Sequence, residues 1–145
     1  MIKKFTKLNP TVFVPMSADL IHHGHINILK KAKKLGRVIV GLMTDTGIFS
    51  YKKKLPLLKY SERKIVVESI KYVDEIIPLP GLNFVEYAKK YKFNFFVHGD
   101  DWRSGVQSEQ RKKLQSLMKK WDGKVIDIAY TKGVSSSKLK KNKRC

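Results

Sequence analysis

Thr11-Val-Phe-Val-Pro-Met16 is a short apolar run that Ser17 and Asp19 close, and a helical pattern follows it within a few residues. The run predicts a buried strand that ends in a polar turn. Gly36 ends the helical pattern, whose members are Ile26, Leu29, Ala32, Lys33 and Leu35. A strand that leads into a helix is the repeating unit of α/β sheets.

The same alternation of strand and helix continues along the chain. Apolar runs predict four further strands, at 38–43, 74–78, 93–97 and 124–129. Three further helices are predicted, over 61–73, 83–91 and 105–121. We expect an α/β fold in one Rossmann-like domain over residues 1–145, with a five-stranded, mostly parallel sheet and helices on both faces.

Two segments near the middle of the chain carry finer expectations. Ser61 is the expected N-cap of the first of these three helices, and its expected apolar face is Ile65, Val66, Ser69, Ile70 and Val73. Residues 44–60 have no clean period and contain Gly47, Pro56 and three consecutive lysines. They are predicted to form a long loop, and loops of this length in compact domains are usually functional.

Composition limits the class of protein. The 145 residues contain 31 Lys and Arg against 12 Asp and Glu, a formal net charge of +19, and the 42% hydrophobic content excludes a wholly disordered chain. No apolar run approaches the roughly 20 residues that span a bilayer, and the N-terminus lacks the pattern of a signal peptide. Cys145 is the lone cysteine and can form no internal disulfide. We expect a soluble, cytoplasmic protein without a membrane partner.

The positive charge is spread along the chain in lysine pairs and ends in a basic tail, residues 138–145. It predicts attraction to polyanions, although a solvated lysine-rich surface is the simpler explanation for most lysines. The tail could fray, lie on a polyanion or form the first turns of a helix. A nucleic-acid-binding α/β module is the alternative function, and it needs aromatic side chains interleaved with a basic face. Phe93, Phe95 and Phe96 lie in an apolar strand instead, so no nucleic-acid partner is expected.

Ligands of open parallel sheets bind at the carboxyl ends of the strands, where the strand order reverses. Four unusual stretches fall at such ends: 17–25, 44–54, 98–102 and 130–137. In the first, His22 and His25 flank Gly24 at a helix start, where N–H groups and the helix dipole favour an anion. Two imidazoles there could donate to oxygens that gain charge in a transition state. Zinc binding would need a third ligand that no other Cys or His cluster supplies, and plain turn and capping residues are the remaining interpretation.

His22-His23-Gly24-His25 resembles the His-x-Gly-His motif of the nucleotidyltransferase superfamily that includes the cytidylyltransferases. Three further stretches are similar to signatures of glycerol-phosphate and phosphocholine cytidylyltransferases: Glu62-Arg63-Lys64 with 72–78, Val97-His98-Gly99-Asp100-Asp101-Trp102, and Thr131-Lys132-Gly133-Val134-Ser135-Ser136-Ser137. The matches stand in the family's order and cover residues 11–140.

Departures from these signatures point to one branch. Met16-Ser17-Ala18-Asp19 replaces the usual Gly-Thr-Phe-Asp, Tyr130 replaces an arginine, and Gly81-Leu82-Asn83-Phe84 replaces a stretch with a tryptophan. These variants, with 50–52 and 102–107, look like the cytidylyltransferase domains of phosphonate biosynthesis, which are often fused to a phosphoenolpyruvate mutase. The resemblance implies CTP-dependent transfer of CMP to a small phosphonate of the 2-hydroxyethyl or 2-aminoethyl type, with pyrophosphate released. The alternative is the same reaction on glycerol 3-phosphate or phosphoethanolamine.

The resemblance also implies roles for individual residues. The expected catalytic residues are His22, His25, Lys52 and Lys54, with the phosphate-binding lysine of 52–54 left open. Expected nucleotide contacts come from Met16, Ser17, Ala18, Gly24, Arg63, Gly99, Asp100, Tyr130, Thr131, Gly133, Ser135, Ser136 and Ser137. Arg63 is disfavoured by the dipole at a helix start, and a surface ion pair is its alternative role. The expected acceptor contacts are Asp19, Asp101 and Trp102, the last equally expected in the core.

No protein-bound metal site is expected, and Mg²⁺ would accompany CTP through phosphates and water. The family further implies a homodimer, and a chain that is a stand-alone enzyme, or else a domain excised from, or a partner of, a phosphoenolpyruvate mutase.

Overall fold

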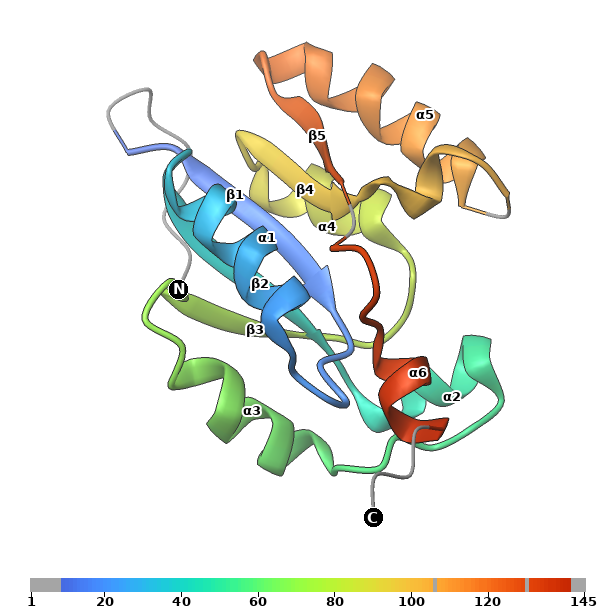
Figure 1. Ribbon diagram of the computed structural model, residues 1–145. Helices are drawn as coiled ribbons and strands as arrows, with labels where there is room; N and C mark the ends of the chain where they lie inside the picture. The colour runs from blue at the N-terminus through green and yellow to red at the C-terminus, as the bar shows by residue number, and fades with distance from the viewer. Residues whose placement is uncertain (1–8, 106, 130, 142–145) are drawn as a thin grey trace.

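Five parallel strands form the centre of the molecule in a computed structural model that describes residues 9–105, 107–129 and 131–141. The strands are β1 (Thr11–Met16), β2 (Arg37–Met43), β3 (Glu75–Leu79), β4 (Phe95–Gly99) and β5 (Lys124–Ile128). Their order in the sheet is β3-β2-β1-β4-β5, and every pairing is parallel (Figure 1). The predicted Rossmann-like α/β fold is confirmed, and the sheet of the described residues is parallel throughout.

Helices cover both faces of this sheet, as Figure 1 shows. On one face α1 (His23–Lys33) and α3 (Tyr60–Glu68) pack through Leu29, Ala32 and Val67 onto alternate strand residues such as Val12 and Val38. On the other face lie α4 (Phe84–Tyr91) and α5 (Ser108–Met118). The core there includes Phe13, Phe84, Phe96, Leu114 and Met118, all 2% exposed or less. Successive strand residues point to opposite faces, so each strand serves both cores.

The expected loop over 44–60 contains a helix, α2 (Asp45–Lys52), which is a correction to the sequence prediction. Thr44 is its N-cap and accepts from the Gly47 backbone N–H at 3.0 Å. A side chain at Gly47 would come within 2.8 Å of the Pro80 backbone. Only Gly47 and Ile48 of this helix are buried. The helix therefore has no periodic apolar face, and the Thr44 cap and the close packing of Gly47 against Pro80 fix its position.

The predicted apolar face of α3 is wrong in its first turns. Ile65 and Val66 are 60% and 44% exposed, whereas Arg63 is fully buried and Val67 packs into the core. Ile70 and Val73 do pack against the core, in the turns beyond the helix. The N-cap is Lys59 and not Ser61, and it makes no side-chain cap bond. A buried arginine at the first inward position broke the periodicity on which the prediction rested.

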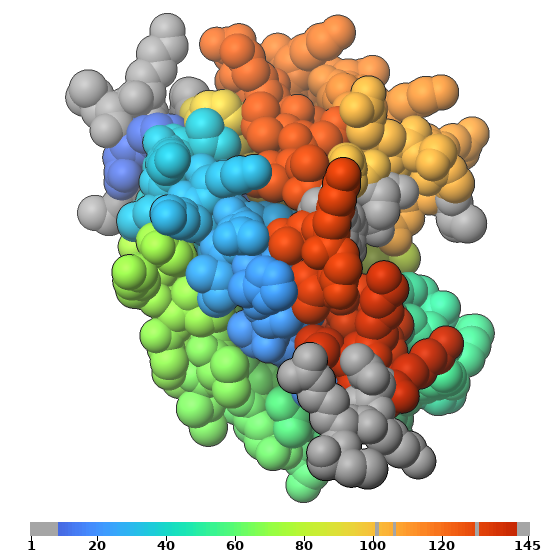
Figure 2. All heavy atoms as spheres, in the orientation of Figure 1, coloured from blue at the N-terminus to red at the C-terminus, as the bar shows by residue number. Residues whose placement is uncertain are grey.

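The last described element is a short helix, α6 (Ser136–Lys141), so of the three possibilities left open for the basic tail, residues 138–141 adopt the helical one. Two 3₁₀ turns, η1 (Asp100–Arg103) and η2 (Lys119–Trp121), complete the elements. Within the described ranges, no helix is both long and apolar enough to cross a bilayer. In Figure 2 the C-terminal segment lies against the β1–α1 region, and the Ser136 hydroxyl donates to the Leu20 carbonyl at 2.9 Å there.

Candidate active site

The site lies where the strand order reverses, at the carboxyl ends of β1 and β4. β1 pairs with β2 as far as Met16, but with β4 only at Val12 and Phe13. Pro15 has no backbone N–H with which to extend a ladder. The two central strands therefore separate beyond Phe13, and the space between their ends becomes a cavity, as expected at the switch point of such a sheet.

The β1–α1 turn brings the imidazoles of His22 and His25 against the start of α1. His22 is the N-cap, and its Nδ1 accepts from the Gly24 N–H at 3.0 Å, while Nδ1 of His25 accepts from the His22 N–H at 3.2 Å. The ring centroids are 4.0 Å apart. A Cβ on Gly24 would stand 2.8 Å from the His22 ring, so glycine is what permits this arrangement. The histidines can serve both as capping residues and as ligand-binding residues, because capping uses only Nδ1 of each ring and leaves Nε2 available.

Both rings are held in the neutral state. Burial, with the nearby His22 as a second cause, lowers the pKa of His25 to about 4, and burial followed by the charge of His23 lowers the pKa of His22. A neutral imidazole whose Nδ1 accepts a hydrogen bond carries its proton on Nε2. The pair therefore presents two uncharged Nε2–H donors without the cost of a buried charge.

The first of two cavities beside these rings, here called the serine cavity, has a volume of about 180 Å³. Hydroxyl, imidazole and lysine groups dominate its walls, which are formed by Ser17, His22, Gly24, His25, Ile28, Lys52, Thr131, Ser135, Ser136 and Ser137. Asn27 holds Thr131 through a 3.0 Å side-chain hydrogen bond, and Ser135 Oγ accepts from the Lys138 N–H at 3.1 Å. Gly133 allows the turn between them with a φ of 83°. Such a set of donors suits phosphate oxygens.

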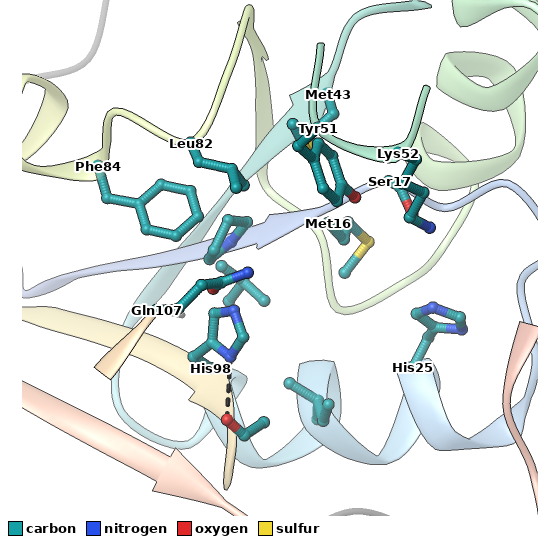
Figure 3. A pocket seen from close by; sticks show the side chains of 14 residues that line it. Met16, Ser17, His25, Met43, Tyr51, Lys52, Leu82, Phe84, His98 and Gln107 are labelled. Atoms are coloured by element: carbon teal, nitrogen blue, oxygen red, sulfur yellow. Dashed lines mark hydrogen bonds between the residues drawn. The ribbon is translucent and has the colours of Figure 1, made fainter. Parts of the chain in front are cut away.

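The second cavity, here called the Gln107 cavity, has a volume of about 280 Å³, and both apolar and polar side chains line it (Figure 3). It opens between β1, β4, α2 and the start of α4, and its walls are Val14, Pro15, Met16, Ser17, His25, Ile28, Met43, Tyr51, Lys52, Leu82, Phe84, His98, Gly99 and Gln107. The two cavities share Ser17, His25, Ile28 and Lys52. A group that reacts at this common wall could be reached from both sides.

Of the three consecutive lysines 52–54, Lys52 is the one that lines the two cavities beside the imidazoles. It lines both cavities and also a third one, whereas Lys54 lines only the third of these, together with Asp19, Lys140 and Lys141. Lys53 is turned away, because it caps α2 with a left-handed φ of 57° and its Nζ donates to the Ser50 carbonyl. Burial, and next the charge of Lys140, lower the pKa of Lys52.

Asp19, expected to bind the acceptor, is instead occupied within the protein. Its side chain is 3% exposed, pairs with Lys140 of α6 and accepts from the Leu58 N–H at 3.0 Å. Burial alone would raise its pKa, but the bonds from Lys140 and from the Leu57 and Leu58 backbone outweigh burial and lower it. Asp19 therefore ties α6 and the 53–59 segment to the β1–α1 turn. Its neighbour Ala18 is buried at a left-handed φ of 53°.

Arg63, expected to contact the nucleotide, is also occupied within the protein. Its fully buried guanidinium donates to the carbonyls of Leu58, Ser17 and Met43 and to Asp45, at 2.6 to 2.9 Å. No exposed surface is left on it for a ligand in this conformation. The alternative prediction was a surface ion pair with no partner named, whereas the structure shows an ion pair with Asp45 made by a fully buried arginine.

Trp102 belongs to the core, so the acceptor-wall role is not supported by its 1% exposure. Its Nε1–H donates to Asp127 at 2.7 Å, and its ring stacks on His98 with centroids 4.2 Å apart. Asp127 is held in turn by Arg111, at 2.5 and 3.0 Å. Trp102 thus packs against His98 and supports the position of that cavity-lining side chain.

The remaining predicted residues divide into three groups. Met16, Ser17 and Gly99 line the Gln107 cavity. Asp100 lies in η1 after β4, but it lines none of the cavities described above. Tyr130 lies outside the described residues, and so does the side chain of Asp101.

Nine residues of the Gln107 cavity were absent from the predicted site: Val14, Pro15, Ile28, Met43, Tyr51, Leu82, Phe84, His98 and Gln107. Most follow a strand end, which is the signal that could have found them. Lys140 was missed as well, because nothing in a lysine-rich tail distinguishes the one lysine that reaches back to Asp19.

The chain is similar in sequence to known proteins. A family model described as cytidylyltransferase-like matches residues 13–142. Glycerol-3-phosphate cytidylyltransferases of Staphylococcus aureus and Bacillus subtilis are each 32% identical, over 123 and 126 residues, and the alignments cover 84% of this chain and 86% and 88% of theirs. The ethanolamine-phosphate cytidylyltransferase of Mus musculus is 34% identical over 123 residues, which are 83% of this chain and 29% of that enzyme.

A solved structure extends the likeness to the fold. The lipopolysaccharide core biosynthesis protein of Thermoplasma volcanium superposes with a TM-score of 0.65 at 24% identity, covering 84% of this chain and 96% of the other. The expected phosphonate branch is not among these findings, whereas the broader family is. This chain belongs to the cytidylyltransferase-like family, and it is a cytidylyltransferase.

Proposed function

We propose that the chain transfers the cytidylyl group of CTP to the phosphate of a small phosphorylated alcohol, of the glycerol 3-phosphate or phosphoethanolamine type, and releases pyrophosphate. The observation that carries this proposal is the pair of neutral imidazoles beside the two cavities: His22 lines the serine cavity, and His25 lies at the wall that both cavities share. The names of the relatives support the acceptor class, because those proteins act on glycerol 3-phosphate and on ethanolamine phosphate.

The reaction is an in-line displacement at the α-phosphorus. An oxygen of the acceptor phosphate forms the new P–O bond, and the bond from the α-phosphorus to the oxygen that bridges it to the β-phosphorus breaks, with the electron pair leaving on pyrophosphate. The attacking phosphate is already ionised near neutral pH, so no strong general base is required. Positioning and stabilisation of the developing charge remain as the tasks of the protein.

The residues divide these tasks. The Nε2–H groups of His22 and His25 donate to oxygens of the α- and β-phosphates, where charge develops. The serine cavity receives the other phosphates through Thr131 and Ser135–Ser137. Lys52 neutralises charge from the Gln107 cavity side. The acceptor enters the Gln107 cavity, whose volume of about 280 Å³ is near the lower end of the roughly 300–1,000 Å³ common for ligand sites. A small acceptor suits that volume better than a nucleotide does.

Mg²⁺ is part of this proposal only as the counter-ion of CTP. Among the described residues there is no group of three His, Cys, Asp or Glu side chains that could hold a metal ion. Asp19 is occupied by Lys140 and a backbone amide. The residues therefore do not fit a protein-held metal, and Mg²⁺, which keeps several waters when bound, would arrive on the phosphates.

A small phosphonate is the second candidate acceptor, and Tyr130 is the observation in its favour. It stands where the glycerol-phosphate and phosphocholine enzymes carry an arginine, which removes one fixed charge and a bidentate donor. The predicted homodimer and the predicted link to a phosphoenolpyruvate mutase stay with this candidate as predictions.

The test is a competition assay. Pyrophosphate release with CTP and Mg²⁺ is measured for glycerol 3-phosphate and phosphoethanolamine against 2-hydroxyethylphosphonate and 2-aminoethylphosphonate. We expect the better phosphomonoester to exceed both phosphonates in kcat/KM. A tenfold advantage of either phosphonate, about 1.4 kcal/mol of transition-state preference, would reverse the order of the two candidates.

A further inference from the structure

Gln107 carries a buried polar atom without a partner. Among the side chains of the described residues, its Oε1 is the buried nitrogen or oxygen that makes no hydrogen bond. Buried polar atoms in folded proteins are nearly always paired, so such an atom needs an explanation. Here the atom belongs to a residue that lines the Gln107 cavity.

The position of Gln107 in the fold does not account for this side chain. It is the N-cap residue of α5, yet its side chain makes no cap bond. Short side chains such as Ser, Thr, Asp and Asn are preferred at N-caps because they reach the first N–H groups. In Figure 3 the side chain instead reaches into the cavity between Phe84 and His98. The carboxamide is therefore displayed toward the cavity and does not serve the helix.

The described side chains that line the cavity around this carboxamide include no carboxylate. None of the fourteen described residues that line the cavity is an aspartate or a glutamate, and the one charged side chain is Lys52. A buried ammonium group needs several acceptors and a compensating charge. A hydroxyl group needs one acceptor for its proton and carries no charge. The cavity meets the second requirement and not the first.

We infer that Gln107 selects an acceptor with a hydroxyl head group, by accepting a hydrogen bond from that hydroxyl, and that the cavity disfavours acceptors with an ammonium head group. The inference rests on the proposed function and narrows it to the hydroxyl-bearing members of its acceptor class. It applies equally to phosphomonoesters and phosphonates, since the head group lies at the other end of the molecule from phosphorus.

Two matched pairs of substrates test this selection. 2-Hydroxyethyl phosphate differs from phosphoethanolamine only in hydroxyl against ammonium, and 2-hydroxyethylphosphonate differs from 2-aminoethylphosphonate in the same way. We expect the hydroxyl member of each pair to have at least a tenfold higher kcat/KM in the wild-type protein. Sites that bind a substrate hydroxyl discriminate strongly because their own polar group is otherwise left unpaired.

Two variants assign the selection to Gln107. Gln107→Leu should lower kcat/KM for the hydroxyl acceptors about tenfold or more while the KM for CTP stays unchanged. Gln107→Glu adds a carboxylate and should move the preference within each pair toward the ammonium member. Gln115→Leu is the matched control, because the same change is made on α5 at a residue that contacts Arg111 and does not line the cavity.

The outcomes are distinct. Equal use of both members of each pair, or a Gln107→Leu variant that alters the KM for CTP and not the acceptor kinetics, overturns the inference while leaving cytidylyl transfer in place. Absence of transfer to all four acceptors by the folded protein overturns the proposed function, and the inference with it.

Discussion

The serine cavity and the Gln107 cavity share one wall but differ in construction. The serine cavity is made of residues on loops and helix starts, and hydroxyl and imidazole donors dominate it. The Gln107 cavity is made largely of apolar side chains at strand ends, with a single carboxamide among them. Phosphate chemistry is the same for every acceptor, whereas the head group varies. The contrast teaches that the donors of the reaction and the groups that choose the acceptor lie on opposite sides of His25.

Arg63 gives the largest expected effect, because it holds one residue of the Gln107 cavity alone, Met43, and one residue of the wall that both cavities share, Ser17. Its hydrogen bonds hold the carbonyls of Ser17 and Met43, two residues that line the Gln107 cavity. Arg63→Met leaves several buried carbonyls unpaired. We expect the free energy of unfolding to fall by about 3–5 kcal/mol, measured by urea denaturation.

Arg37→Met is the matched control for this variant. Arg37 pairs with Glu75 at 2.6 Å, but the side chain is 33% exposed. Exposed ion pairs contribute about 0–1 kcal/mol, so the control should lose no more than that. Because Met43 lines the Gln107 cavity alone whereas Ser17 lines both cavities, residual Arg63→Met enzyme at low temperature should show a larger rise in the KM for the acceptor than in the KM for CTP. Equal stability losses in the two variants would contradict the role given to Arg63.

His25 comes next in expected effect, since it belongs to both cavities. His25→Ala removes a neutral donor aimed at developing charge, and loss of one such donor typically lowers kcat by about 100- to 1,000-fold. The measurement is pyrophosphate release under saturating substrates, with thermal unfolding to verify the fold. His23→Ala is the control on the same turn, because His23 is exposed and lines neither cavity. Turnover of His25→Ala within tenfold of the His23→Ala value would refute the assignment.

The fold was predictable because its signals are local. Each strand is a continuous apolar run, and four of the main helices carry enough of the 3.6-residue period to be recognised. The failures arose where structure depends on contacts that sequence does not display. α2 is held by a cap and by the approach of Gly47 to Pro80, and α3 turns inward on an arginine that only its partners explain.

The site was predictable to a different degree on its two sides. The His motif and the Ser135–Ser137 stretch bring donors together in short segments, so the serine cavity could be largely assigned from sequence. The Gln107 cavity collects residues from seven separated stretches of the chain, and no spacing links residues such as Tyr51, Leu82, His98 and Gln107. The charged residues Asp19 and Arg63 were expected to face ligands, but their side chains hydrogen-bond to other groups of the protein. Charge and position alone do not reveal which polar groups are already paired.

The smallest expected effect is a dependence of stability on pH that originates at the shared wall. The pKa of His25 is about 4 in the folded chain, against an ordinary value of 6.5. Between these values the unfolded chain binds a proton that the folded chain does not, so stability rises with pH over this window. Conversely, as pH falls from 6.5 toward 4, stability should decrease by up to about 1.4 kcal/mol per pH unit from this residue. Asp19, whose pKa is lowered from 3.8, loses its own contribution to stability only at still lower pH.

The measurement is urea denaturation of the ligand-free protein between pH 4 and 7, compared with the His25→Gln variant, whose residue 25 cannot titrate. The variant should retain only the weaker dependence from His22, whose pKa is lowered too. A slope in His25→Gln as steep as in the wild type would mean that burial does not lower the pKa of His25 in the folded chain.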